Sequence, residues 1–229
     1  MKTVVVTGAD GNLGTAVTRE FLKEGYQVIA TVINEQAKKK IKKHSRLDVQ
    51  VVNLTNENET ADFIKAAIKK YKQIHAALLL VGGFAMGDIP ATTGADLKKM
   101  YSLNFETAFF TTRPLLAHMK QKGTGRIIFV GARPAIKPDD AKNMIAYALS
   151  KSLLFNLAEY INADTKGTNV TATVVVPSTL DTAINREAMP KANPANWVKP
   201  DDIAAIMQFI CGSNSQALRE SIFKIYNNA

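Results

Sequence analysis

The sequence predicts a single-domain α/β protein in which about seven parallel strands form a doubly wound sheet with helices on both faces. Two observations predict this class. Short apolar runs alternate with helical patterns along nearly all of the 229 residues. The strand-like runs are apolar at consecutive positions, as expected for strands that are buried on both faces of a parallel sheet. Because no repeat, low-complexity tract or linker interrupts this alternation, we expect residues 1–229 to form one domain.

The first half of the chain contains four predicted strands and two clear helices between them. The strands are predicted at 2–7, 27–33, 48–53 and 75–81, and the helices at 13–24 and 57–71. The first strand is rich in Val, and Gly25 ends the first helix. This order indicates successive β-α-β units.

The second half continues the alternation with longer helices. Helices are predicted at 95–103, 106–122, 143–164 and 201–210, and strands at 126–130, 170–176 and 221–226. The last helix opens with Pro200, Asp201 and Asp202, a combination typical of helix N-termini. Ligands of such a sheet bind beyond the C-terminal ends of its strands, and the motifs described below all follow a strand.

Composition excludes several classes of protein. The longest apolar run, 76–81, is too short to cross a membrane, and strand residues begin directly after Met1 and Lys2, so no signal peptide is expected. The single cysteine, Cys211, excludes an internal disulfide and fits a reducing cytoplasm. The three histidines lack the spacing of metal ligands, so no metal is expected. The sequence therefore predicts a cytoplasmic protein that is not bound to a membrane.

The chain is basic, with a formal net charge of +9. Much of this charge lies in a lysine-rich run at 38–44, which has neither a recognition module nor interleaved aromatic residues. We therefore expect no nucleic-acid partner and interpret the run as the solvated face of a short helix. An alternative is that it raises the local concentration of an anionic cofactor.

A glycine-rich turn follows the first strand and precedes the first helix. Gly8, Gly11 and Gly14 allow a tight turn, the approach of backbone N–H groups to phosphates, and close packing of the helix on the sheet. In a β-α-β unit this turn predicts a nucleotide-binding, Rossmann-type fold that takes NADH or NADPH. The residues of the turn expected to contact the cofactor are Gly8, Asp10, Gly11, Asn12, Leu13 and Gly14.

Other strand ends are expected to complete the NAD(P)-binding site. The predicted cofactor contacts there are Asn34, Asn53, Leu54, Val81, Gly82, Gly83, Pro177, Leu180 and Thr182, with Thr182 as a hydroxyl partner of the nicotinamide carboxamide. A carboxylate that would select NADH is missing from the end of the second strand, where Ile33 and Asn34 stand. The choice between NADH and NADPH is therefore open.

Tyr147 and Lys151 lie four residues apart in a predicted helix, so they project from the same face one turn apart. A phenol beside a cation can deliver a proton, because the cation stabilises the phenolate. Together with the glycine turn, this pair predicts an oxidoreductase.

These motifs and the order of elements resemble the short-chain dehydrogenase/reductase family over essentially the whole chain. The resemblance implies that Tyr147 is the proton donor and that Lys151 holds the nicotinamide ribose and lowers the pKa of the tyrosine. It also implies that Asn104 holds a water molecule in a proton relay to the lysine. In place of the family's carbonyl-binding Ser, this chain has Ala132. Asn53 stands where the family has its adenine-contacting Asp.

One branch of the family, dihydropteridine reductase, shares these departures. The resemblance rests on 81–84, 130–132 and above all the segment from Pro177 through Pro190 to Trp197. It implies hydride and proton transfer to a quinonoid dihydropteridine-like substrate, which forms no alkoxide and does not require the Ser. The expected substrate contacts are Phe84, Ala132, Met189 and Trp197, with a lid at about 178–199. Ile33 departs from this branch, which has an Asp there.

The resemblance also implies a homodimer, with a tetramer as an alternative, formed by two helices that are apolar over wide arcs. Their apolar residues are Phe105, Phe109, Phe110, Leu115, Leu116, Leu149, Leu153 and Phe155. Two other functions stay open. One is a reductase of small ketones or aldehydes, including 3-oxoacyl compounds, in which Ser178 or Thr179 supplies the missing donor. The other is a non-catalytic NAD(P) sensor, which would have no need of the Tyr147 phenol.

Overall fold

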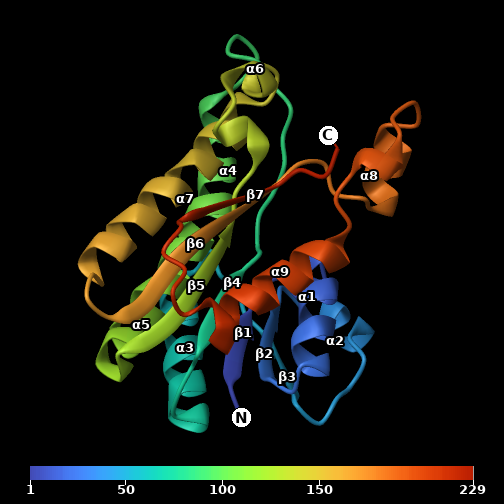
Figure 1. The fold of residues 1–229 in the computed structure, drawn as a ribbon. Coiled ribbons are helices and arrows are strands. Elements are labelled where there is room, and N and C mark those ends of the chain that lie inside the picture. Colours follow the sequence, from blue (N-terminus) through green and yellow to red (C-terminus); the bar gives the residue numbers. More distant parts are fainter. Residues whose placement is uncertain (229) are drawn as a thin grey trace.

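The computed structural model describes residues 1–228, which form one seven-stranded parallel sheet with helices on both faces (Figure 1). The strand order is β3-β2-β1-β4-β5-β6-β7. The chain begins in the middle of the sheet, winds outward to β3, and then crosses to β4 and winds outward to β7. The winding direction therefore switches between β1 and β4, and the predicted fold class is confirmed.

The predicted strands and helices occur in the predicted order, and the short helices α6 and α8 have no predicted counterpart. The strands are β1 (Thr3–Val6), β2 (Gln27–Val32), β3 (Leu47–Val51), β4 (Ala76–Leu79), β5 (Thr124–Val130), β6 (Asn169–Pro177) and β7 (Ile222–Ile225). The helices are α1 (Asn12–Lys23), α2 (Glu35–Lys40), α3 (Glu57–Tyr71), α4 (Gly94–Tyr101), α5 (Thr107–Lys122), α6 (Pro138–Ala141), α7 (Ile145–Asp164), α8 (Ala183–Ala188) and α9 (Pro200–Cys211). Short 3₁₀ turns lie at Arg133–Ala135, Pro194–Asn196 and Ser213–Ser215.

Two apolar layers hold the helices against the sheet. Neighbouring residues of β1 point to opposite faces, so Val5 packs in the layer under α3, α5 and α7, while Val4 and Val6 pack in the layer under α1 and α9. Every residue of β1, β2 and β4 is buried. This burial explains why these strands are apolar without alternation.

The predicted boundaries differ from the observed ones mostly at the ends of elements. The clearest correction concerns the predicted gap between the helices at 95–103 and 106–122. There α4 continues into α5 through a π-helical turn at Ser102–Glu106. The Thr107 hydroxyl donates to the carbonyl of Leu103 at 2.8 Å inside this turn. Such widened turns occur often at functional sites, and this one carries Asn104.

The lysine-rich run begins on a short helix, as predicted: α2 contains Lys38, Lys39 and Lys40, and the rest of the run lies beyond it. No helix within residues 1–228 is long and apolar enough to cross a membrane.

The end of β1 is tied to the end of β4 at the switch point. The Thr7 hydroxyl oxygen accepts hydrogen bonds from the backbone N–H groups of Leu80 and Val81 at 2.9 and 3.3 Å. The segments that follow β1 and β4 are therefore held side by side, and the site described next is built on them.

Candidate functional site

The glycine turn after β1 has the geometry of a phosphate-binding turn. Gly8 has φ +65°, a conformation that side chains other than glycine disfavour. A Cβ on Gly14 would overlap the carbonyl oxygen of Gly8 and lie 2.8 Å from the Cα of Ala9, so α1 can approach the turn only with glycine there. Gly11 caps α1 without a side-chain hydrogen bond to its first N–H groups, and Asp10 and Asn12 on either side of it are exposed.

The residues directly after β2 and β3, at 33–34 and 52–54, carry no carboxylate. Ile33 is 59% exposed there. The Asn34 side chain caps α2, because its oxygen accepts the N–H of Ala37 at 2.8 Å. The Asn53 oxygen accepts from the N–H and hydroxyl of Thr55, and Leu54 is buried. The oxygens of both Asn side chains are thus engaged within the protein, and no hydrogen bond occupies the amide NH₂ group of Asn34 or Asn53 within residues 1–228.

The loop after β4 runs close to the lysine of the predicted pair. A Cβ on Gly82 would lie 2.5 Å from Oδ1 of Asn104 and 3.0 Å from Nζ of Lys151, so any other residue here would have to displace the Asn104 side chain. Asn104 is fully buried; its Oδ1 accepts the N–H of Gly83 at 2.9 Å, and its Nδ2 donates to the carbonyl of Gly83 at 3.1 Å. The predicted residues of this loop are therefore brought together, whereas the water relay assigned to Asn104 stays a prediction.

The Lys151 side chain is almost completely buried. It is 5% exposed, and its ammonium donates to the carbonyl oxygen of Val130 at 2.8 Å. No carboxylate among residues 1–228 lies within 4.0 Å of it. Burial therefore lowers the pKa of Lys151 to about 8.

Tyr147 lies one turn earlier on α7, as predicted, but the expected shift of its pKa is wrong for the free protein. Burial of the hydroxyl raises the pKa of Tyr147 to about 12 instead of lowering it. The reason is that the Lys151 ammonium is bonded to the Val130 carbonyl and does not offset the loss of hydration. The phenol is consequently protonated at neutral pH, which is the form a proton donor requires.

An aromatic side chain covers the tyrosine. The Phe84 ring lies 5.1 Å from the Tyr147 ring in an edge-to-face arrangement, and Phe84 is 61% exposed. Ala132 is buried and offers no hydrogen-bond donor. The Ser178 hydroxyl donates to the carbonyl of Tyr226 at 2.8 Å, so this proton is already engaged.

The segment after β6 carries α8, which stands out from the body beyond the strand ends (Figure 1). Thr182 caps this helix by accepting the N–H of Asn185 at 3.2 Å, and the carbonyl of Leu180 accepts the amide of the same Asn185 at 2.9 Å. Both bonds hold the start of α8 against the segment that precedes it. Met189 is exposed, whereas Trp197 is 6% exposed and offers almost no surface to a substrate in this state.

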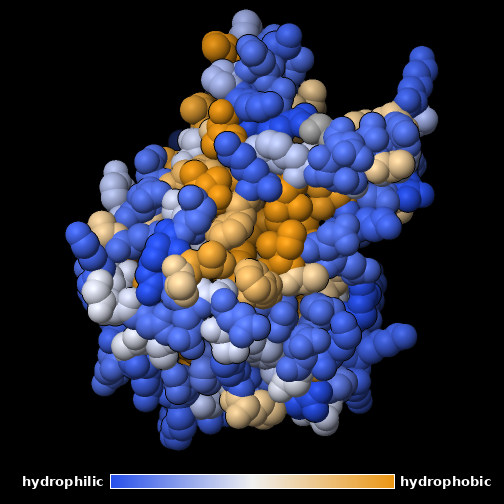
Figure 2. Space-filling model, in the orientation of Figure 1, coloured by the Kyte–Doolittle hydropathy of each residue, from blue (hydrophilic) through white to orange (hydrophobic). Residues whose placement is uncertain are grey.

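Apolar surface gathers beside this segment. Figure 2 shows it concentrated in the hollow between α8 and the upper part of the molecule. The loop after β4 and the α8 segment expose large apolar side chains at Phe84, Met86, Ile89, Ile184 and Met189. Both segments therefore present apolar side chains to solvent.

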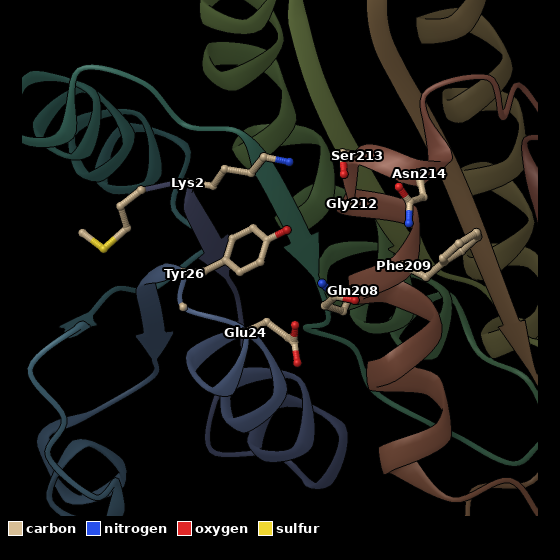
Figure 3. A pocket seen from close by; sticks show the side chains of 10 residues that line it. Lys2, Glu24, Tyr26, Gln208, Phe209, Gly212, Ser213 and Asn214 are labelled. Atoms are coloured by element: carbon tan, nitrogen blue, oxygen red, sulfur yellow. The ribbon is translucent and has the colours of Figure 1, made fainter.

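A cavity of about 410 Å³ lies at the opposite end of the sheet (Figure 3). Lys2 and Tyr26 point there toward the end of α9, and both donate to the carbonyl of Cys211, at 3.4 and 3.5 Å. Such bonds satisfy carbonyl groups at a helix C-terminus, which is a structural role. Burial raises the pKa of the Cys211 thiol to about 12, so it is not a reactive thiolate. No cluster of metal-ligating side chains occurs in the described part of the chain.

Two contacts at the site were not predicted: the carbonyl of Val130 and the hydroxyl of Ser150, which is buried between Asn104 and Tyr147. Ser150 could have been found, because residues three apart share a helix face and Ser150 follows Tyr147 at that spacing. The Val130 carbonyl carries no signal in the sequence.

The chain is similar in sequence to known proteins of one family. A model of the short chain dehydrogenase family matches residues 2–193. The 3-ketodihydrosphingosine reductase of Mus musculus is 30% identical over 189 residues, covering 78% of this chain and 56% of that protein. The chain thus spans little more than half the length of this relative.

Two solved structures share the fold over nearly the whole chain. The 3-ketoacyl-(acyl-carrier-protein) reductase from Brucella melitensis complexed with NADH has a TM-score of 0.87 at 16% identity, covering 99% of this chain and 97% of that one. ElxO with NADP bound has a TM-score of 0.89 at 18% identity, covering 98% and 96%. At this identity the likeness establishes the fold.

Proposed function

Because the chain belongs to the short-chain dehydrogenase family, we propose that it is an NAD(P)H-dependent oxidoreductase that reduces a quinonoid dihydropteridine-like substrate. The observation that carries this proposal is Ala132. At this position just after β5, where the resemblance places the donor of a carbonyl reductase, the chain has a buried methyl group. Losing one such donor weakens stabilisation of a developing oxyanion by about 3 kcal/mol. A conjugated ring that accepts a hydride without forming an alkoxide does not need this donor.

The residues of the site fit a dinucleotide. The glycine turn leaves the first N–H groups of α1 free for a pyrophosphate, and Gly82 leaves open backbone beside Lys151. When bound, NADH or NADPH supplies the hydride. Lys151 then holds the ribose, and the protonated hydroxyl of Tyr147 delivers the proton to the substrate.

Phe84 supports a flat substrate. Its exposed ring lies edge-on to Tyr147 and can turn to stack on a planar ring system. Met86 and Ile89 on the same loop, and Ile184 and Met189 across the site, would exclude water from the other parts of the ring. The α8 segment in this proposal is a lid over the substrate.

A second candidate is a reductase of ketones or aldehydes. It is favoured by the names of similar proteins, which include a 3-ketodihydrosphingosine reductase and a 3-ketoacyl-(acyl-carrier-protein) reductase. In this alternative another hydroxyl must replace the missing donor. Ser178 already donates to Tyr226, so Thr179 is the better candidate.

We also propose that the protein is a homodimer. Large apolar side chains are exposed together on α4, α5 and α7, at Leu97, Tyr101, Phe109 and Leu149. An apolar groove of about 380 Å³ lies between α4 and α7. A second copy of the chain is the occupant we expect, because isologous contacts are the commonest in oligomers. Light scattering should give twice the chain mass, and Leu149→Glu should give the monomer; a monomeric wild type rejects the dimer.

The proposed reaction is tested by substrate choice. Purified protein is assayed with NADH and with NADPH against quinonoid dihydropterin and against a panel of ketones, aldehydes and 3-oxoacyl thioesters. Turnover of the pterin is the expected result. Turnover of carbonyl compounds alone would reject the pterin in favour of the second candidate. Cofactor binding without oxidation by any of these substrates would favour the sensor.

A further inference from the structure

The helix that carries the catalytic pair has a third side chain directed into the site. Ser150 lies between Tyr147 and Lys151 in the sequence and is 4% exposed. Its hydroxyl donates to the backbone carbonyl of Tyr147 at 2.8 Å and accepts from Nδ2 of Asn104 at 2.9 Å. A serine hydroxyl has one proton, so with that proton on Tyr147 it can only accept from Asn104.

This restriction favours the same orientation of the Asn104 amide as the two bonds to the Gly83 backbone do. The NH₂ group must face Ser150, which leaves Oδ1 to accept the N–H of Gly83 at 2.9 Å. With the amide turned over, its oxygen would face the Ser150 oxygen and its NH₂ group would face the N–H of Gly83. Both contacts would be repulsive in a fully buried place, where an unsatisfied polar group is strongly unfavourable.

The Asn104 amide in turn determines where the loop after β4 runs. It bonds both the N–H and the carbonyl of Gly83, and it lies so close to Gly82 that a Cβ there would be 2.5 Å from Oδ1. The same Cβ would be 3.0 Å from Nζ of Lys151. The position of this backbone relative to the ammonium therefore depends on the chain of contacts from Ser150 through Asn104 to Gly83.

We propose that Ser150 is a positioning residue, which through Asn104 holds the Gly82–Gly83 backbone at the distance from Lys151 that the cofactor requires. The proposal rests on the proposed function, since the loop matters only if a dinucleotide lies against it. Its physical content, the coupling of Ser150 to Gly83, can be measured without any cofactor.

The same helix offers a matched control. The Ser152 hydroxyl donates to the carbonyl of Leu149 at 2.7 Å, which is the same bond to the residue three positions earlier. Ser152 makes no contact with Asn104. Ser150→Ala and Ser152→Ala therefore remove equivalent bonds within the helix, and only the first leaves Asn104 without its acceptor.

Two measurements test the proposal. Hydrogen exchange of the cofactor-free protein should be about tenfold faster across 80–84 in Ser150→Ala than in wild type, with α9 as an internal reference. Titration with NADH and NADPH, followed by their fluorescence, should give about tenfold weaker binding for Ser150→Ala and unchanged binding for Ser152→Ala. In the Asn104→Ala background, Ser150→Ala should add less than about twofold, because the two residues act through one contact.

The outcomes separate the two proposals. Equal exchange across 80–84 in both serine variants, or full additivity with Asn104→Ala, would overturn the positioning role. Wild type that binds neither reduced cofactor, while exchange still responds to Ser150→Ala, would overturn the proposed function and limit Ser150 to coupling the loop to the helix. If Ser150→Ala alone fails to fold, Ser150→Cys, with a weaker acceptor of similar shape, is expected to give a smaller change in the same direction; no change would overturn the role.

Discussion

Because Lys151 is buried, the stability of the cofactor-free protein should depend on pH by an amount that can be calculated. Burial lowers the pKa of this lysine from 10.5 to about 8, because the charged form loses hydration and gains only the Val130 carbonyl as a partner. The charged lysine thus destabilises the cofactor-free fold by about 3 kcal/mol at neutral pH. Such a penalty is expected at a site that awaits a ligand rather than one optimised for stability.

The direction of the pH dependence follows from proton binding. Below pH 8 both the folded and the unfolded chain carry the proton, so stability does not respond to the pH through this residue. Between the folded value of about 8 and the unfolded value of 10.5, the unfolded chain binds more protons, and stability rises with pH. From about pH 7 to about pH 9.5 the gain is about 2 kcal/mol. Tyr147, with its pKa raised to about 12, stays protonated throughout this window.

The assay is urea unfolding of wild type and Lys151→Met across this window without cofactor. The free energy of unfolding of wild type should rise relative to the variant by about 2 kcal/mol, because Met cannot release a proton. The Lys151→Met variant also loses the hydrogen bond to the Val130 carbonyl, which shifts its free energy of unfolding by an amount that does not change with pH. Lys166→Met, at an exposed lysine just after α7, is the control and should follow wild type. If the difference in the free energy of unfolding between wild type and Lys151→Met does not change with pH, the argument that the Lys151 ammonium is buried away from water is refuted.

Three further changes test other parts of the site. Gly14→Ala should abolish NADH and NADPH binding in fluorescence titrations, because its Cβ would overlap the Gly8 carbonyl and displace α1 from the turn; binding within about threefold of wild type would contradict this. Ala132→Ser should raise kcat/KM for carbonyl compounds more than for the pterin, because only the former develop an oxyanion that accepts the new bond; equal effects would undo the argument from Ala132. Ile33→Asp should weaken NADPH relative to NADH by about tenfold or more, since a carboxylate at the end of β2 repels a 2′-phosphate; an unchanged ratio of the two affinities would show that this position does not face the adenosine ribose.

Much of the fold could be predicted because the signals are local. Strands buried on both faces give uninterrupted apolar runs, and every predicted strand and helix occurs in its predicted order. The short helices α6 and α8, which contain too few residues for a helical period to show, were not predicted. The helix predicted at 57–71 coincides with α3, whose N-terminus is capped by Asn56. The π-helical turn at Ser102–Glu106 could not be predicted, because it depends on how α4 and α5 pack around Asn104 and not on residue type.

The candidate site, like the fold, could be predicted from the sequence only in part. The spacing of Tyr147 and Lys151 predicts that they share a helix face, but their pKa values depend on burial by distant segments, which spacing does not reveal. Asn34 illustrates a signal that was available: an Asn before the first turn of a helix is a common cap, and its oxygen is used that way.

The account depends most on Tyr147 as the proton donor beside a bound cofactor. The direct measurement is oxidation of NADH or NADPH by quinonoid dihydropterin, compared between wild type and Tyr147→Phe, together with the affinity of each for the cofactor. We expect wild type to turn over the pterin and Tyr147→Phe to lose turnover by about a hundredfold or more, with cofactor affinity nearly unchanged. A variant that reduces the pterin as fast as wild type would contradict the role of this phenol and with it the proposed mechanism.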